Sequence, residues 1–326
     1  MKRICSLALA CLLLLGVALS LGACGGKTGY TVGVLQLTQH DALDAATQGF
    51  CDALKAELGE ENVTIDIQNA SGDTNACNTI ANTFVTKNYD LILANATAAL
   101  QAAANATMQI PVLGTSVTDY ATALGLKDFN GTVGGNISGT SDLAPLDEQA
   151  QMILDFVPNP SKVGLLYCSA EANSKFQVDT VESALIAKGL SSGQVVKYSF
   201  SDSNDIAAVI SRAAGECDVL YIPTDNTAAN AASTIYNAMT TKKPIIAGEE
   251  SICRLCGIAT LTISYYDIGY ETGKMAAKIL RGEAKVADMP IAYAPKFTKK
   301  YNATICRELG ITAPAGYEAI PGTEAE

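Results

Sequence analysis

Apolar and polar positions along the chain follow two alternating patterns, which predict strands and helices in regular succession. Every second position is apolar at Val63, Ile65 and Ile67, as in a half-buried strand. Apolar residues recur four positions apart at Phe50 and Leu54, as on one face of a helix. By these criteria the first part of the chain is predicted to contain strands at 30–37, 62–69, 89–94 and 111–117, and helices at 44–58, 74–86 and 98–108.

The same succession restarts after the turn-forming segment 158–160, which reads Pro-Asn-Pro. Strands are predicted at 162–168, 194–200, 219–223, 244–248 and 258–264, and helices at 173–188, 205–214, 226–239, 266–280 and 304–309, with a further extended run at 289–293. Strands separated by helices indicate parallel sheets covered on both faces. The predicted fold class is therefore α/β, with two doubly wound parallel-sheet lobes.

The chain is expected to pass between the lobes several times, and so to form a multi-strand hinge. The glycine-rich stretch 133–140 suits a first crossover, and segments near 262–266 and 290–295 suit two more. The expected organisation is a first lobe of 30–136 plus 266–288 and a second lobe of 140–262 plus 292–326. Ligands of such folds collect at the carboxyl ends of the strands, in the gap between the lobes.

The first 23 residues have the pattern of a secretory signal peptide, with a basic start, an apolar run and small residues before Cys24. A transmembrane helix is the alternative, because the apolar run approaches the length of a membrane span. The string 21–24 (Leu-Gly-Ala-Cys) resembles a bacterial lipoprotein processing box, in which the cysteine becomes the acylated N-terminus. Residues 24–29 would then be an anchor with acyl chains such as palmitate and a short linker, which places the body at the outer face of the cytoplasmic membrane.

Composition excludes several classes of protein. Of the 326 residues, 48% are apolar and 17% are charged, which excludes a disordered chain. Lys and Arg number 22 against 33 Asp and Glu, so the net charge of −11 argues against a nucleic-acid partner. The sequence has one histidine and no GxSxG, GxGxxG or GxxxxGK[ST] motif, so we expect neither an enzyme nor a bound metal or cofactor.

Seven of the ten cysteines follow Cys24, an odd number for a secreted protein. The spacing Cys253-x-x-Cys256 admits a redox or zinc site, but no second such pair and no nearby histidine supports one. Small buried apolar residues are the simpler interpretation. A bridge from Cys253 to Cys256 or to Cys306 stays open.

Several stretches resemble a family of ABC-transporter substrate-binding lipoproteins. These stretches are 33–36 (GVLQ), 40–44 (HDALD), 49–50 (GF), 136–143 (NISGTSDL), 171–174 (EANS), 223–226 (PTDN), 248–250 (GEE) and 269–277 (GYETGKMAA). The resemblance implies the type I periplasmic-binding-protein fold and a role in import. Its known members bind tryptophan or tyrosine, so an aromatic amino acid is the implied cargo, and an ABC permease is the implied partner of a monomeric receptor. The alternatives are a sensory or adhesive lipoprotein of the same fold, or a receptor for a sugar or a nucleobase.

An amino acid needs donors for its carboxylate and acceptors for its ammonium group, and both kinds of residue follow the predicted strands. Thr97 begins a helix whose dipole favours an anion, with Asn95 as an orienting partner, although Thr97 could instead only cap the helix. Asp225 is the candidate acceptor for the ammonium group, with helix capping as its alternative. The remaining candidates for ligand contact are Gln36, Thr118, Asp119, Asn173, Ser174, Asn226 and Glu250.

Two other kinds of residue have weaker claims to the site. His40 is expected to have a helix-entry or ligand-contact role rather than to act as a catalytic base, because no nucleophile motif accompanies it. Tyr120, Tyr265 and Tyr266 are candidates to contact an aromatic ligand, with core or hinge packing as their default role.

Overall fold

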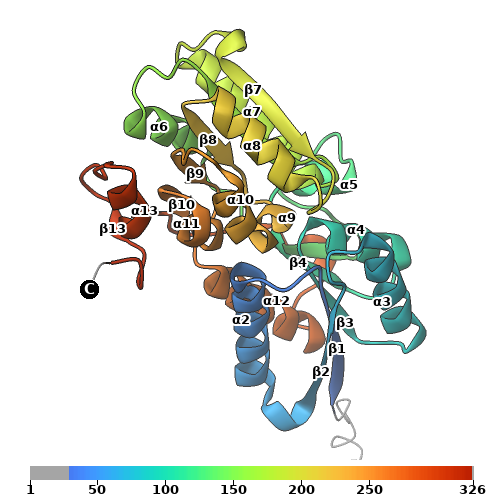
Figure 1. The fold of residues 1–326 in the computed structure, drawn as a ribbon. Coiled ribbons are helices and arrows are strands. Elements are labelled where there is room, and N and C mark those ends of the chain that lie inside the picture. The colour runs from blue at the N-terminus through green and yellow to red at the C-terminus, as the bar shows by residue number, and fades with distance from the viewer. Residues whose placement is uncertain (1–28, 325–326) are drawn as a thin grey trace, which may run out of the picture.

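The computed structural model describes residues 29–324 as two α/β lobes joined by three chain crossovers (Figure 1). The expected signal peptide at 1–23, the expected lipidation site Cys24 and almost all of the expected linker lie outside the described residues. Within 29–324, no helix combines the length and the apolar character that a membrane span requires.

The first lobe is built on a six-stranded sheet in which all strand pairs are parallel. In spatial order its strands are β11 (Ala292–Tyr293), β5 (Ile137–Ser141), β4 (Val112–Val117), β3 (Leu91–Asn95), β1 (Tyr30–Gln36) and β2 (Val63–Asn69). The central strands β1, β3 and β4 are almost wholly buried and rich in Val, Ile and Leu, as parallel strands covered on both faces must be.

Helices cover both faces of this sheet. On one face α2 (Asp41–Leu58) lies beside α12 (Tyr265–Leu280), which comes from far along the chain (Figure 1). Their side chains Phe50, Leu54 and Met275 pack against Val32 and Val34 of β1. The other face is covered by α3 (Thr74–Thr86), α4 (Thr97–Ala106) and α5 (Tyr120–Leu124).

The second lobe holds a seven-stranded sheet that is parallel except where β12 runs against β10. In spatial order its strands are β13 (Glu318–Ala319), β12 (Thr298–Tyr301), β10 (Ala259–Thr262), β9 (Ile245–Ala247), β8 (Val219–Ile222), β6 (Val163–Cys168) and β7 (Val195–Phe200). Its helices are α6 (Leu146–Phe156), α7 (Ala172–Ala187), α8 (Ile206–Glu216), α9 (Asn226–Asn230), α10 (Ala232–Ala238), α11 (Glu250–Cys256) and α13 (Ala303–Glu308). Short 3₁₀ turns occupy Glu60–Asn62, Ser192–Gln194 and Val286–Asp288.

The chain crosses between the lobes at 141–146, 262–265 and 293–298. The α/β architecture expected from the sequence is confirmed, but the strand assignment differs at β5, β11, β12 and β13, of which β12 and β13 lie where no strand was expected. Residues 137–141 form β5 in the first sheet, where the sequence indicated only a crossover, and β11 also joins that sheet. The first lobe therefore takes in residues 140–141 and 292–293, which the sequence had assigned to the second lobe.

Candidate functional site

The carboxyl ends of strands from both sheets border the interface between the lobes, and two cavities lie there. We call the larger one, about 350 Å³, the crossover cavity, because the crossover residues 262–266 line it together with the start of α2 and with α11. We call the other, about 250 Å³, the strand-end cavity, because its lining follows β1 and β2 of the first lobe and β6, β7 and β8 of the second. Both cavities are walled by residues of both lobes.

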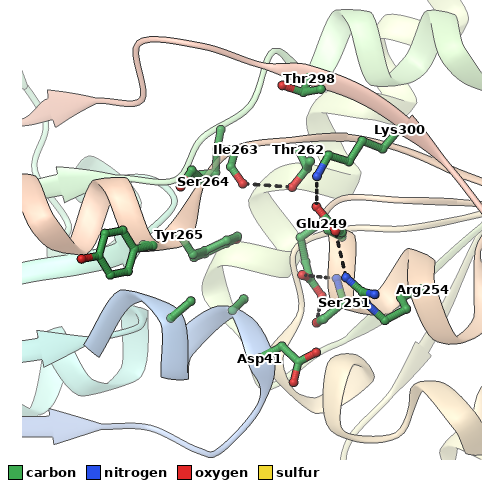
Figure 2. A pocket seen from close by; sticks show the side chains of 14 residues that line it. Asp41, Glu249, Ser251, Arg254, Thr262, Ile263, Ser264, Tyr265, Thr298 and Lys300 are labelled. Carbon is green, nitrogen blue, oxygen red and sulfur yellow. Dashed lines mark hydrogen bonds and ion pairs between the residues drawn. The ribbon is translucent and has the colours of Figure 1, made fainter. Parts of the chain in front are cut away.

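In the crossover cavity, the charged side chains of the second lobe are largely paired with one another. Glu250 accepts from Arg254 at 3.0 Å and from Lys300 at 2.6 Å, so this carboxylate, a candidate from the sequence, is already neutralised. Figure 2 shows Asp41 of α2 on the opposite side of the cavity from Lys300. Tyr265 also lines this cavity and is buried.

At the carboxyl ends of β1 and β3, two candidate residues hold α2 in place. Gln36 donates to Asp44 at 2.6 Å and accepts from Thr47 at 2.6 Å. Asn95 donates to the Leu43 carbonyl at 2.8 Å and to the Thr47 hydroxyl at 3.0 Å. Within the described part of the chain, Asn95 Oδ1 is buried without a hydrogen-bond partner, so it retains one acceptor.

The backbone is strained where β3 and β4 end. Ala96, with φ 94° and ψ 160°, occupies a region that is almost exclusive to glycine, and α4 begins after it without a side-chain cap. Thr97, the first residue of α4, is buried. Ser116 has φ 54°, and its buried hydroxyl has no hydrogen-bond partner among residues 29–324.

The residues that follow β4 stabilise local structure. Asp119 caps α5 by accepting from the Thr122 N–H at 2.7 Å. The Thr118 carbonyl accepts from the Ser141 hydroxyl at 2.9 Å, which ties the end of β4 to the end of β5. Tyr120 lies in the core of the first lobe and donates to the Thr140 carbonyl at 3.1 Å.

Asp142, which follows β5 directly, is a buried carboxylate that the sequence analysis did not single out. It is 4% exposed, and its Oδ2 accepts from the Tyr265 hydroxyl at 3.0 Å. Its Oδ1 has no hydrogen-bond partner among the described residues. Burial raises the pKa of Asp142 to about 6, which the Thr118 and Tyr265 hydroxyls partly oppose and the nearby Glu249 carboxylate reinforces. In the sequence, Asp142 lies within the stretch 136–143 that carries the family resemblance, but no local feature marks it as a ligand contact.

Across the interface, Asp225 has both carboxylate oxygens engaged. It caps α9 by accepting from the Ala228 N–H at 2.8 Å, and it also accepts from the Cys168 N–H at 2.7 Å. Burial raises its pKa, and the Glu171 carboxylate nearby raises it further. Asp225 therefore joins the end of β6 to the start of α9.

Glu171 organises the other second-lobe candidates. It accepts from the backbone and side chain of Asn226, at 3.1 and 2.8 Å, and from the Asn173 amide at 3.2 Å. Asn173 also donates to the Thr224 carbonyl at 3.0 Å, and Ser174 is fully buried beside it. These side chains are close together, but most of their hydrogen-bonding capacity is used within the lobe.

Two side-chain contacts cross the interface beside the strand-end cavity. His40 Nε2 lies 3.2 Å from Asn226 Oδ1, and Asn230 donates to the Thr38 hydroxyl at 2.8 Å. Because each contact joins one lobe to the other, the two lobes are in direct contact here.

The seven cysteines of the described residues are buried free thiols, so none of the bridges left open by the sequence is formed. Burial raises the pKa of Cys51, Cys77, Cys168 and Cys306 to about 11. Within residues 29–324, no group of His, Cys, Asp and Glu is arranged to hold a metal ion.

Known proteins resemble this chain along most of its length. The model of the family "ABC transporter substrate binding protein" matches residues 31–320. A tyrosine-binding protein of Clostridioides difficile is 37% identical over 268 residues, which cover 81% of this chain and 76% of that protein.

Two solved structures superpose on this chain to different extents. An ABC domain from Streptococcus pneumoniae in complex with L-Trp, 33% identical, has a TM-score of 0.84 and covers 90% of this chain and 100% of its own. A ligand-free, open substrate-binding protein with adhesive properties from Clostridium difficile is 37% identical, with coverages of 89% and 99%, yet its TM-score is 0.68.

The more similar sequence thus has the less similar structure. One structure carries L-Trp and the other is ligand-free and open, and opening a hinge lowers the overall superposition without changing either lobe. The present arrangement matches the ligand-bound structure, in agreement with the contacts across the interface. Together, the two-lobed fold, the polar strand ends and the match over residues 31–320 show that the chain belongs to the ABC transporter substrate-binding protein family.

Proposed function

We propose that this substrate-binding protein receives an aromatic amino acid between its lobes and delivers it to an ABC permease. The relatives with a tyrosine-binding name and with bound L-Trp support this cargo. One observation carries the proposal: the chain superposes on the L-Trp complex with a TM-score of 0.84, and its lobes border a cavity of about 350 Å³ lined by Tyr265 and Tyr266. Tyrosine rings favour contact with another aromatic ring.

The size and lining of this cavity suit a single small metabolite. Ligand cavities of proteins begin at about 300 Å³ and combine an apolar surface with a few polar groups. Ser251, Thr262 and Ser264 supply hydroxyls in the crossover cavity, and Ala42 and Ala45 supply apolar surface.

For the ligand carboxylate we propose the start of α4, whose second residue Ala98 lines the strand-end cavity and not the crossover cavity. The first turn of a helix presents unpaired N–H groups and a partial positive charge. α4 has ten residues and no side-chain cap, and Thr97 adds a hydroxyl at its first position. Asn95 Oδ1, which is free and buried just before this turn, provides an acceptor beside it.

We further propose that the body is a lipoprotein at the outer face of the cytoplasmic membrane. Signal peptidase would cleave after residue 23, and acyl chains on Cys24 would provide the anchor. The sequence of 21–24 supports this placement, because a receptor held there lies next to the permease that takes its cargo. A single chain suffices for binding in this proposal, and no enzymatic turnover is involved.

The decisive experiment measures binding directly. The protein has no tryptophan, so fluorescence excited selectively in the indole band reports added L-Trp alone. We expect this emission to change on binding, and the melting temperature to rise with L-Trp or L-Tyr, since a ligand at 100 times its Kd stabilises by about 2.7 kcal/mol. Glucose and adenine are the controls. If millimolar concentrations of both amino acids change neither signal, the proposed cargo is wrong.

A second role is favoured by one specific relative, the open Clostridium difficile structure, which is described as having adhesive properties. A surface receptor of the same fold would bind its ligand without supplying a permease. Uptake of labelled tryptophan and tyrosine by cells that lack the gene separates the two roles. Loss of uptake supports import, and undiminished uptake with intact binding supports the adhesive or sensory role.

A further inference from the structure

We propose that Asp142 accepts the ammonium group of the ligand, so that the site selects compounds with a protonated primary amine beside their carboxylate. This inference rests on the proposed function and adds to it the residue that recognises the amine.

The Asp142 carboxylate is stabilised by neutral groups alone, the Tyr265 and Thr118 hydroxyls. Oδ2 accepts from the Tyr265 hydroxyl at 3.0 Å, whereas Oδ1 has no partner within residues 29–324. No lysine or arginine of the described residues forms an ion pair with it. A buried charged oxygen without a partner is costly, and a cation that donates a hydrogen bond removes that cost.

Two other unpartnered polar atoms lie at the ends of the neighbouring strands. Asn95 Oδ1 ends β3 and the Ser116 hydroxyl lies near the end of β4, while Asp142 follows β5. Strand pairing places these three ends side by side, because Asn95 is opposite Thr115 and the Asp142 N–H bonds to the Val117 carbonyl. A primary ammonium group has three N–H donors, so it suits Asp142 together with the Ser116 hydroxyl on the adjacent strand β4, whereas Asn95 lies beside the start of α4.

The spacing of the strands fits an amino acid that bridges α4 and Asp142. The start of α4 follows β3 and Asp142 follows β5, so two strand spacings of about 4.8 Å, or about 10 Å, separate them. In an α-amino acid the nitrogen and a carboxylate oxygen are about 3 Å apart, and two hydrogen bonds of about 2.8 Å extend the span to about 9 Å. An amino acid therefore reaches from the helix terminus to the carboxylate.

Asp225, the acceptor expected from the sequence, is a weaker candidate. Its two oxygens each hold a backbone N–H, of Ala228 and Cys168. A ligand ammonium at Asp225 would have to share oxygens that already position α9 and β6. Asp142 Oδ1 has no such commitment.

Asp142 and its partner also occupy the hinge. Asp142 lies on the crossover between β5 and α6, and Tyr265 begins α12 at the end of the crossover from β10. Their hydrogen bond joins two of the three crossovers. A ligand amine bound to Asp142 thus acts where the lobes pivot.

The test compares L-Trp with its deaminated analogue, indole-3-propionate, in wild-type protein and in Asp142→Asn. Asparagine keeps the shape and an oxygen for Tyr265 but removes the charge. We expect Asp142→Asn to weaken L-Trp binding by at least about 100-fold, since the ammonium loses its buried counter-charge. We expect it to bind indole-3-propionate at least as tightly as wild type does. Asp155→Asn, at an exposed position in α6, is the matched control and should bind L-Trp normally.

Each outcome of this comparison has a definite meaning. Asp142→Asn binding L-Trp within about threefold of wild type would overturn the role of Asp142 and leave the proposed cargo intact. An equal loss for both compounds would also overturn it, because the effect would not depend on the amine. If the wild type binds neither L-Trp nor L-Tyr, both the cargo and this role fall. Circular dichroism and melting temperature establish that the variant is folded.

Discussion

Ala96 and Ser116 take up left-handed backbone conformations at the ends of two adjacent strands. A side chain at such angles costs about 1–3 kcal/mol, which persists only where the surroundings enforce it. Both residues lie at the strand ends that face the interface, and Ala96 sets the direction in which α4 starts. The strain is thus located where we propose that the ligand carboxylate binds.

Replacing Ala96 by glycine removes the strained Cβ. We expect Ala96→Gly to raise the free energy of unfolding by about 1 kcal/mol. This net gain is the backbone strain that is relieved minus the cost of the greater conformational entropy that glycine gives the unfolded chain. Ala104→Gly, inside the same helix, is the control and should lower it by about 1 kcal/mol. Urea unfolding measures both. A destabilised Ala96→Gly variant would show that the Ala96 backbone is not strained.

Ligand binding should depend on pH through Asp142, whose pKa burial raises to about 6. The ammonium group needs the ionised carboxylate, so Kd should rise about tenfold for each pH unit below 6 and level off above it. The titratable groups that face Asp142 are Glu249, Tyr120 and Tyr265, and the pKa of each of these two buried tyrosines is raised, so they stay neutral in this range. Calorimetric titration with L-Trp between pH 5 and 8 measures the effect.

The stability of the ligand-free protein should change in the opposite sense. Because the folded state raises the pKa of Asp142, its contribution is fully present below the ordinary pKa near 4 and is lost as the pH rises through about 6. The loss amounts to about 3 kcal/mol. Asp142→Asn should remove the pH dependence of Kd and of the free energy of unfolding in this range. If L-Trp binding by the variant still depends on pH, the pair of carboxylates Asp225 and Glu171 is the source instead.

At the residue scale, the sequence identified polar residues at the strand ends but not which of their side-chain atoms stay free of partners in the fold. Asp225 and Asp142 both follow buried strands, and nothing local distinguishes them. Asp225 acquires two N–H partners from its own lobe, while Asp142 keeps one oxygen free. Which carboxylate stays unpaired depends on partners far away in sequence.

At the scale of elements, α2 and α12 pack closely because glycines occupy their contact. A Cβ added at Gly269 would lie 2.0 Å from the Ala46 carbonyl oxygen, and one at Gly49 would lie 2.1 Å from the Tyr266 carbonyl oxygen. The backbones approach too closely for any side chain at these positions. α2 carries His40 and Asp41 at its start and α12 carries Tyr265, so this contact fixes the first-lobe wall of the crossover cavity.

Adding a methyl group at Gly269 forces the two helices apart. We expect Gly269→Ala to lower the free energy of unfolding by at least about 2 kcal/mol, as overpacking of a close contact does. Gly215→Ala in α8 is the matched control: a Cβ there meets nothing within 4 Å, so it should stabilise by about 0.5–1 kcal/mol. Thermal and urea unfolding report both changes. A neutral Gly269→Ala would mean that α12 can shift without cost.

Most elements with strong apolar periodicity were predictable, although the amphipathic helix α6 was missed, and the polar strand β5 was not predictable. β5 reads Ile-Ser-Gly-Thr-Ser and has no alternating apolar pattern, so the sequence indicated only a crossover. Its hydroxyls are satisfied by distant partners, since Ser138 donates to the Met289 carbonyl and Thr140 bonds to Thr272 of α12. α6, α5 and α11 were also missed, and the helix predicted at 226–239 is two helices, α9 and α10, that meet at Ala231.

At the scale of the whole molecule, the lobes touch through a few polar contacts beside the strand-end cavity. His40 meets Asn226, and Asn230 meets Thr38, each pair bridging the two lobes. Such contacts exist only when the lobes are together, so they bias the hinge toward the closed arrangement. The ligand and these contacts therefore favour the same state.

Removing one of these contacts should open the protein. We expect Asn230→Ala to weaken L-Trp binding by about fivefold, the equivalent of one hydrogen bond of about 1 kcal/mol, mainly through faster dissociation. Small-angle scattering should show a larger radius of gyration without ligand. Asn78→Ala, at an exposed position in α3, is the control. Unchanged dissociation in Asn230→Ala would show that the Thr38 contact does not contribute to closure.

The sequence by itself determined the succession of strands and helices, the two lobes, the polar character of the strand ends and the family resemblance. These features follow from periodicity and from motifs, which are properties of neighbouring residues. The tertiary structure alone decided that the polar segment 137–141 is a strand, that Gly269 lies against α2, and that Asp142 rather than Asp225 keeps a free oxygen. Burial and hydrogen bonding decide these points, and both depend on which distant segments come together when the chain folds.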